Sequence, residues 1–494
     1  MTIGQPECRR GSILLIFLGI SAGWAAAQGG YFSATTIWTP WHHDDFSGMS
    51  WAGVLKLAAP RPVSSNLISF LGQFEPMIYY AAFFIISFFA LSFIARLVLD
   101  IFEVELGDFG NLVFGFLGAF LWFSQVGAAQ MVQYLGLMTN ALSMLSAFAA
   151  ASLLVRAYGR QSRSFTWPVG IAFAGLVLFS AFAKEDMLLF LLWTCLFIAV
   201  RLHFDGASPL KAILPAAIVV VAYGLSFAHV KIYGSPFVLG TGPYGLAGVK
   251  DNIILAIRFY AVFSLVAAGL LFIWVVAFLL SLGLFFRSKE PPLISIGALY
   301  IIGAFAALVA PYLVLPRRFE FYAMNFYPLL SFGLLPLIVM FARHCGARGL
   351  AAVWTGVIVS GSATALAFHL EATNRHAHMA WLKTIRERSF IQIQETQRAA
   401  DLGMRNCRTI FVTGVSDNLG PFLMDSARFM RLRMRIAAQW QIVAMPGTIL
   451  EVWSKSRGFP TNWQYVPPET GAPDQSCRLD FDPRTFRAAF KAPS

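Results

Sequence analysis

The sequence predicts an all-α polytopic membrane protein with about eleven transmembrane helices, followed by a small C-terminal α/β domain. The first observation is composition, since 57% of the 494 residues are hydrophobic and only 13% are charged. With 47 phenylalanines and a mean hydropathy of +0.65, the chain is more apolar than a soluble globular protein. The second observation is that long apolar segments recur as far as about residue 370. The third is that acidic and basic loops alternate between them.

The spans follow from length, because a hydrocarbon core of about 30 Å needs roughly 20 apolar residues in a helix. The candidate segments, of which 187–201 is short, are 13–30, 76–97, 110–127, 134–155, 167–183, 187–201, 211–229, 255–286, 294–315, 325–343 and 350–369. The first also resembles a signal peptide with a cleavage site of small residues near Ala25. Because ten further spans follow it, we expect it to remain as a span.

Orientation follows from the basic residues, which fall in alternate connections. They are Arg9, Arg10, Arg96, Arg156, Arg160, Arg163, Arg201, Lys211, Arg287, Lys289, Arg343 and Arg348. Positively charged loops tend to stay in the cytoplasm, so these connections and the N-terminus are expected inside. The other connections, with their acidic and mixed charges, are expected outside.

Three consecutive charges interrupt the apolar stretch 168–200. Lys184, Glu185 and Asp186 would each cost about 2.5 to 3.5 kcal/mol inside a membrane. We therefore expect a tight hairpin that brings them to the outer surface. A solvated turn without a functional role is the alternative for these three residues.

Beyond residue 370 the long apolar runs stop, which divides the chain into a membrane domain (1–370) and a soluble α/β domain (371–494). Short patterns predict strands at 408–415 and 440–445 and a helix at 420–435. Cys407 and Cys477 both lie here, and a pair of cysteines fits an oxidising compartment. We expect them to form a disulfide in a domain that lies outside the membrane.

The outer face then combines groups that could transfer a sugar from a phosphate. Asp44 and Asp45 supply a carboxylate that can take a proton from an attacking hydroxyl. Cations can hold a leaving phosphate, and Lys184, Arg317 and Arg318 are the candidates. Aromatic rings suit sugars, and the outer loops carry Trp41, Tyr244 and Tyr322.

Four motifs in this order resemble the GT-C class of polytopic glycosyltransferases, which use polyprenyl-phosphate-linked sugars. They are HHDDF at 42–46, RPVSS at 61–65, AKEDM at 183–187 and LPRRFEFY at 315–322. The resemblance implies that Asp44, with Asp45 beside it, is catalytic. It also implies a middle loop at Lys184 and Glu185, and a basic loop at Arg317 and Arg318 near the donor phosphate.

On this resemblance we expect an inverting membrane glycosyltransferase in a bacterial inner membrane. It would move a sugar from a polyprenyl-phosphate donor to an extracytoplasmic glycan, lipid or protein, without nucleic acid. Lys184, Arg317 and Arg318 would bind the donor phosphate. The residues that position substrate would be Glu185, Asp186, Trp41, Tyr244 and Tyr322. His42 and His43 precede the acidic pair, which leaves open a divalent cation such as Mg²⁺ or Mn²⁺.

Each residue also has a structural alternative. Asp44 or Asp45 can cap a following helix, Arg317 and Arg318 can contact lipid headgroups, and Tyr244 can belong to a turn. Two other functions stay open. One is a glycan polymerase or ligase that uses diphosphate-linked donors, and the other is a secondary transporter, which would place charges near the membrane midplane.

Overall fold

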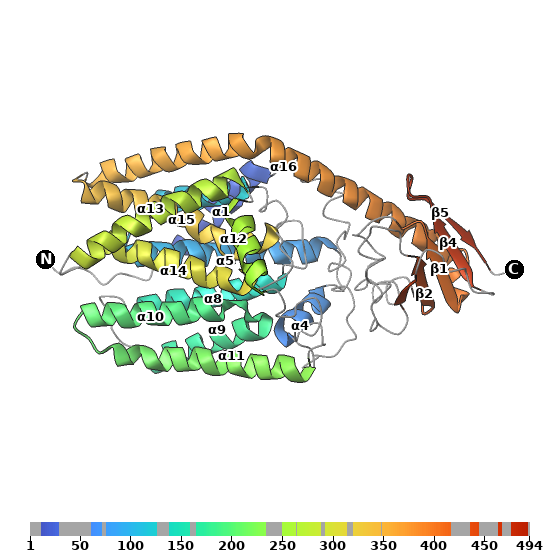
Figure 1. Ribbon diagram of the computed structural model, residues 1–494, viewed down its shortest axis with the longest axis horizontal. Helices are drawn as coiled ribbons and strands as arrows, with labels where there is room; N and C mark the ends of the chain where they lie inside the picture. Colours follow the sequence, from blue (N-terminus) through green and yellow to red (C-terminus); the bar gives the residue numbers. More distant parts are fainter. Residues whose placement is uncertain are drawn as a thin grey trace.

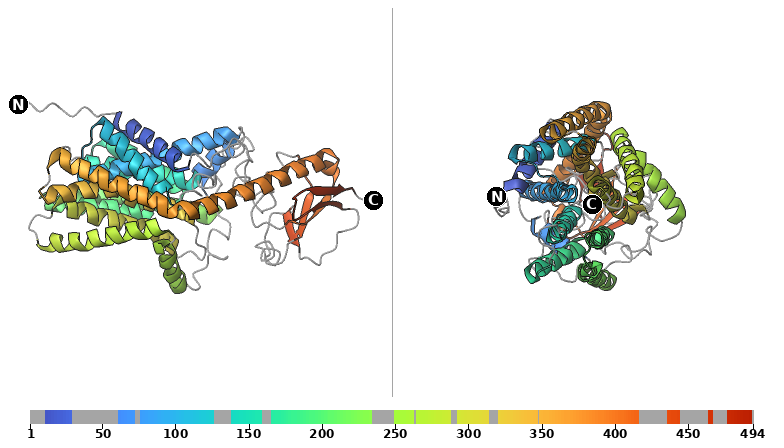
Figure 2. Two further views of the ribbon diagram at one scale, coloured as in Figure 1. Left: turned by 90° about the horizontal axis from the view of Figure 1, so that it is seen from above. Right: turned by 90° about the vertical axis from the view of Figure 1, so that its left-hand side faces the viewer.

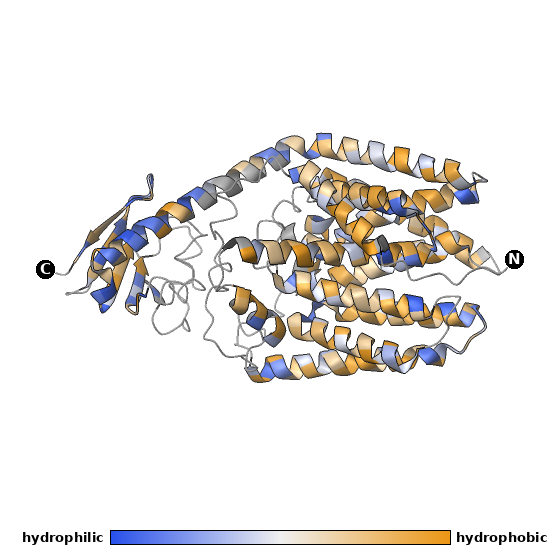
Figure 3. Ribbon diagram, turned by 180° about the vertical axis from the view of Figure 1, so that it is seen from behind, coloured by the Kyte–Doolittle hydropathy of each residue, from blue (hydrophilic) through white to orange (hydrophobic). Residues whose placement is uncertain are grey.

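The computed structural model describes residues 11–28, 61–71, 76–125, 138–158, 165–233, 249–262, 264–287, 292–313, 320–346, 348–415, 435–443, 463–466 and 476–492. Among them, a bundle of apolar helices is joined by one long helix to a five-stranded sheet (Figure 1). The bundle is strongly hydrophobic, whereas the second half of the long helix and the sheet carry many hydrophilic residues (Figure 3). The chain is thus a multi-pass membrane protein with a more polar C-terminal domain.

Every expected span has a corresponding helix. The bundle helices are α1 (Gly11–Gln28), α5 (Pro76–Phe102), α6 (Asp108–Phe123), α8 (Met138–Ala157), α9 (Trp167–Ala183), α10 (Leu188–Phe204), α11 (Ile213–Tyr233), α13 (Leu265–Arg287), α14 (Leu293–Leu313), α15 (Tyr327–His344) and the first half of α16 (Gly349–Asp401). In the described residues, eight helical segments are long and apolar enough to cross a membrane, and α1, α6 and α9 are shorter apolar helices.

The expected span 255–286 is corrected by the structure, because the chain forms two helices there. A short helix, α12 (Val249–Val262), turns away from the bundle axis before α13 begins (Figure 2). The break is stabilised at the start of α13, where Glu371 Oε1 accepts the backbone N–H of Leu265 at 2.8 Å and Ser264 Oγ accepts that of Ala267 at 3.0 Å. Such capping groups satisfy N–H groups that a helix start leaves unpaired.

The bundle has two chemically different ends. At the basic end, where α5, α8 and α10 finish, Asp100 pairs with Arg96 at 2.9 Å and Arg156 at 2.8 Å, and Glu103 pairs with Arg201. At the domain end, α16 leaves the bundle towards the sheet (Figure 1). The short helix α4 (Pro62–Leu71) and the Lys184 turn lie at the domain end. The sequence predicts basic connections in the cytoplasm. Their arginines and lysine, where the structure describes them, lie at the end of the bundle opposite Lys184.

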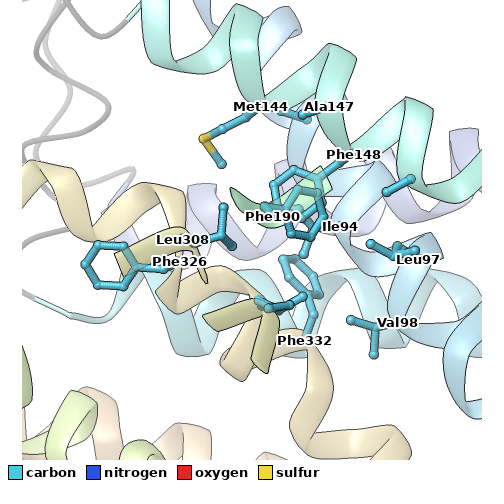
Figure 4. Packing of buried hydrophobic residues seen from close by; sticks show 14 of the residues in the cluster. Ile94, Leu97, Val98, Met144, Ala147, Phe148, Phe190, Leu308, Phe326 and Phe332 are labelled. Atoms are coloured by element: carbon cyan, nitrogen blue, oxygen red, sulfur yellow. The ribbon is translucent and has the colours of Figure 1, made fainter. Parts of the chain in front are cut away.

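The bundle core consists of tightly packed aliphatic and aromatic side chains. Figure 4 shows Ile94 of α5 lying beside Phe148 of α8 and Phe190 of α10. Phe148 and Phe190 have ring centroids 4.5 Å apart. These side chains are buried, so they hold α5, α8 and α10 together.

Helix α1 packs backbone to backbone against α6. A Cβ on Gly19 would lie 2.2 Å from Leu112 O, and one on Gly115 would lie 2.4 Å from Ile16 O. Small residues that let two helices approach this closely are typical of membrane helix pairs. The buried Gln28 side chain also donates to Phe123 O at 3.1 Å. Both contacts make α1 part of the bundle.

The domain boundary expected at residue 370 falls inside α16, which continues as one helix to Asp401. The sheet follows, with β1 (Thr409–Thr413), β2 (Gln439–Val443), β3 (Trp463–Val466), β4 (Cys477–Phe481) and β5 (Ala488–Lys491) in the order β3-β2-β1-β4-β5. The predicted strands at 408–415 and 440–445 correspond to β1 and β2, whereas the predicted helix at 420–435 lies almost entirely outside the described residues.

The parallel strands point back towards the bundle. Arg388 of α16 lies over the Phe486 ring, and Glu395, about two helical turns further on, accepts the N–H of Ala488 at 3.2 Å. The chain entering β5 therefore runs in the same direction as α16. Because β5 is antiparallel to β4, and β1 to β4 are mutually parallel, the carboxyl ends of β1 to β4 face the bundle.

The expected disulfide between Cys407 and Cys477 is present, with a Cα–Cα distance of 6.1 Å. It links the start of β4 to the segment just before β1, and Cys477 is the register partner of Ile410. The disulfide therefore holds together two neighbouring strands at the end of the sheet that lies away from the bundle.

Candidate functional site

A buried turn between α9 and α10 is the most polar feature of the domain end. Helix α9 stops at Ala183 because Lys184 adopts an extended backbone, with φ −166° and ψ 142°. A single 3₁₀ turn, η3 (Glu185–Met187), then leads directly into α10. The expected hairpin therefore exists, and its geometry pairs Lys184 with Asp186 while Glu185 meets Arg61.

Asp186 is the hub of these contacts, and its side chain is only 6% exposed. Its carboxylate pairs with Lys184 Nζ at 3.0 Å and accepts from Asn325 Nδ2 at 3.1 Å. Tyr312 donates its hydroxyl to the same carboxylate, and Ser143 Oγ lies 3.3 Å from Asp186 Oδ1. A carboxylate with this many donors is fixed in position and well compensated for its burial.

Lys184 lies between this carboxylate and two aromatic rings. Its ammonium is 5.5 Å from the Tyr312 ring centroid and 5.3 Å from that of Tyr322. Those distances are within the range of cation–π attraction. Burial lowers the pKa of Lys184, while the adjacent Asp186 opposes that shift. The turn therefore holds an amine that is closely surrounded by protein.

Glu185 turns the other way and meets Arg61, which lies 124 positions earlier in the chain. Arg61 donates through Nε to Glu185 Oε2 at 3.0 Å and through its terminal nitrogen to Oε1. Burial alone would lower the pKa of Arg61, but Glu185 more than offsets this and raises it. Ser64 Oγ also donates to Ala183 O at 2.9 Å. Helix α4 is thereby held against the end of α9 at two points.

A second layer of polar groups supports the turn from within the bundle. Ser180 Oγ lies 3.1 Å from Tyr223 OH and donates to Ser143 O. Asn140 Nδ2 donates to Asn325 Oδ1 at 3.3 Å. These side chains come from α8, α9, α11 and the segment before α15, so the turn is attached to most of the surrounding helices.

The structure brings together four of the residues that the sequence singled out, namely Lys184, Glu185, Asp186 and Tyr322. The turn is not simply solvated, because the side chains of Lys184 and Asp186 are 12% and 6% exposed and paired with each other, and Glu185, at 26% exposed, is paired with Arg61. The other candidates, Asp44, Asp45, Arg317, Arg318, Trp41, Tyr244, His42 and His43, lie outside the described residues.

Sequence reasoning missed Arg61, Tyr312 and Asn325. Arg61 opens the RPVSS motif, but nothing in a single sequence shows that it pairs with Glu185. Tyr312 belongs to an apolar span, where a tyrosine is usually read as packing. The only available signal was that Tyr312 and Asn325 lie on either side of the basic LPRR segment.

The described residues contain no group of three or more His, Cys, Asp or Glu side chains that could hold a metal ion. No protein-family model matches the chain, and no curated protein matches it. The chemistry of the site is therefore what indicates a function.

Proposed function

We propose that the protein is a GT-C-type membrane glycosyltransferase that moves a sugar from a polyprenyl-phosphate donor to an extracytoplasmic acceptor. The observation that carries the proposal is the Lys184 ammonium, held by Asp186 between the Tyr312 and Tyr322 rings at the domain end of the bundle. A positioned cation is suited to stabilise the charge that develops on a departing phosphate. Aromatic rings beside it provide surfaces for a sugar or an isoprenoid.

The reaction is a substitution at the anomeric carbon of the donor sugar. Asp44 removes the proton from the acceptor hydroxyl, whose oxygen then forms the new glycosidic bond. The bond from the anomeric carbon to the phosphate oxygen breaks, and polyprenyl phosphate leaves with the electron pair. A single displacement inverts the anomeric configuration. Lys184, with Arg317 and Arg318, stabilises the leaving phosphate in this proposal.

The distribution of charge favours an enzyme over a transporter. In the described residues, the most deeply buried charged residues are Asp186, Arg201 and Glu371. Arg201 lies at the basic end, and Asp186 and Glu371 lie at the domain end. A transporter would be expected to place ionisable groups near the middle of its helices.

The same arrangement supports the orientation in this proposal. The basic end carries Arg96, Arg156 and Arg201, which favours the cytoplasmic side. The domain end and the disulfide-bonded sheet are then extracytoplasmic, in a bacterial inner membrane. Open α/β sheets bind ligands at the carboxyl ends of their parallel strands, and in this domain those ends face the bundle, which suits presentation of an acceptor.

The test is sugar transfer by purified protein in lipid nanodiscs, supplied with labelled polyprenyl-phosphate sugars and extracted cell-envelope acceptors. We expect Lys184→Gln to lower turnover per folded molecule by about 100-fold, the scale for losing a group that stabilises transition-state charge. Lys231→Gln is the matched control, because Lys231 is exposed in the last turn of α11 at the same end. Equal turnover in Lys184→Gln and Lys231→Gln would remove Lys184 from the reaction.

A further inference from the structure

The two carboxylates of the Lys184 turn are held very differently. Asp186 is 6% exposed and has four donors, from Lys184, Ser143, Tyr312 and Asn325. Glu185 is 26% exposed. Its carboxylate accepts hydrogen bonds from Arg61. Asp186 is therefore fixed, whereas Glu185 can leave its partner without disturbing the network around Asp186.

The two cations are close enough to repel each other. Arg61 and Lys184 pair with the carboxylates of two adjacent residues, Arg61 with Glu185 and Lys184 with Asp186, each at 3.0 Å, and the nearby guanidinium is one cause of the lowered pKa of Lys184. Two cations brought together at one site need anions for charge compensation. In the structure those anions are the carboxylates of Glu185 and Asp186, and only the first is exchangeable.

Arg61 is also free to change partners without releasing its helix. The second contact of α4 with the turn, from Ser64 Oγ to Ala183 O at 2.9 Å, does not involve Glu185. Guanidinium binds the two oxygens of a carboxylate and those of a phosphate with the same planar geometry. The geometry that Arg61 uses for Glu185 would thus serve equally for a phosphate.

We propose that Arg61 is a second cation for the lipid-linked phosphate and that Glu185 occupies its binding site until the phosphate arrives. This inference rests on the proposed function. Glu185 then acts as an internal competitor that lowers phosphate affinity, and Lys184 and Arg61 hold the phosphate together once Glu185 has moved away. No covalent bond changes in this exchange.

The experiment measures binding of polyprenyl monophosphate, the leaving group of the reaction, to the full-length protein in nanodiscs. Glu185→Gln keeps the shape of the side chain but removes its charge, so we expect about tenfold tighter binding. Arg61→Gln should weaken binding by about tenfold or more, and Arg61→Lys should recover part of the loss. In the Arg61→Gln, Glu185→Gln double variant the gain from Glu185→Gln should vanish, because the gain depends on Arg61.

The matched control is Glu103→Gln at the basic end. It breaks a similar pair, in which Arg201 and Glu103 have side chains 9% and 27% exposed, and it should leave phosphate binding unchanged. A purely structural Arg61–Glu185 pair predicts lower thermal stability in both single variants and no tighter binding in Glu185→Gln. That result would overturn the inference.

The same data separate failure of the inference from failure of the proposed function. If wild type binds polyprenyl monophosphate and Lys184→Gln does not, while Arg61→Gln and Glu185→Gln bind like wild type, only the exchange is refuted. If wild type binds polyprenyl monophosphate no better than it binds an uncharged polyprenol, the proposed donor is refuted, and the proposed exchange is refuted with it.

Discussion

The Lys184 ammonium lies 3.0 Å from the carboxylate of Asp186, two residues further along the chain, and both side chains are almost fully enclosed by protein. An enclosed ion pair of this kind is costly to break, because removing one partner leaves the other charge uncompensated. Breaking the pair should therefore lower the stability of the protein, and changing the charge of Lys184 should change phosphate binding.

Asp186→Asn should destabilise the folded protein by about 3 to 5 kcal/mol, the usual loss for a buried pair deprived of one partner. The reason is that Lys184 and the donors from Tyr312 and Asn325 lose their anion. Thermal unfolding in detergent measures the effect. Glu105→Gln, at an exposed position beyond α5, should leave Tm unchanged, and an unchanged Tm in Asp186→Asn would contradict the burial seen here.

The lowered pKa of Lys184 gives a pH dependence with a defined sign. Because burial lowers it below the ordinary 10.5, the folded protein binds fewer protons than the unfolded chain between the two values. Raising the pH through that window should therefore increase stability through this group, while it weakens phosphate binding as the ammonium becomes neutral. Lys184→Arg should move this loss of binding to higher pH, as measured by titrating polyprenyl monophosphate at several pH values. If wild type and Lys184→Arg lose phosphate binding at the same alkaline pH, the group that titrates is not Lys184.

The contact between α1 and α6 predicts an asymmetric response to alanine. Gly19→Ala should destabilise the protein, since the new Cβ would overlap Leu112 O. Gly175→Ala in α9 is the matched control, because a Cβ there meets nothing within 4 Å, and replacing glycine in a helix adds up to about 1 kcal/mol of stability. Equal Tm values in the two variants would mean that α1 does not pack on α6.

Reducing the Cys407–Cys477 disulfide should destabilise the C-terminal domain. The bond closes a loop of 70 residues, for which the chain-entropy model gives roughly 4 kcal/mol. Cys407→Ser should make the sheet domain sensitive to proteolysis while the bundle stays folded. Mass spectrometry of protein purified without reductant should find the two thiols linked; two free thiols would contradict an oxidising compartment for this domain.

Asp44→Asn tests the proposed base. If proton transfer is its role, turnover should fall by roughly 10² to 10⁴ with normal folding. If Asp44 only caps a helix, the change costs about 1 kcal/mol of stability instead, and turnover per folded molecule stays the same. Asp45→Asn serves as the neighbouring control, with a smaller loss expected. Full activity in both single variants and in the double variant would leave the mechanism without its central residues.

Much of the fold was predictable because long apolar runs and basic connections are strong signals in a single sequence. Segments such as 167–183 and 294–315 are found as α9 and α14 with little change. The break between α12 and α13 was not predictable, since it depends on Glu371, more than 100 residues further along the chain. Composition predicts a domain boundary at residue 370, but polar residues beyond it continue the same helix.

The candidate site was predictable only in its local part. Lys184, Glu185 and Asp186 stand out as charges within an apolar stretch, and their hairpin follows from the cost of burying charge in lipid. Their partners come from distant segments, as Arg61 and Tyr312 do. Such pairings are decided by tertiary packing, on which the spacing of residues within one sequence carries no information.

The most direct test of the account is an experimental structure of the protein with polyprenyl monophosphate bound in a lipid nanodisc. We expect the phosphate at the domain end, with one oxygen about 2.7 to 2.9 Å from Lys184 Nζ, the usual length of a charge-assisted hydrogen bond. Arg61 should contact a second oxygen, with Glu185 displaced from it. A phosphate bound elsewhere, with the Lys184 turn unchanged and the Arg61–Glu185 pair intact, would contradict the account.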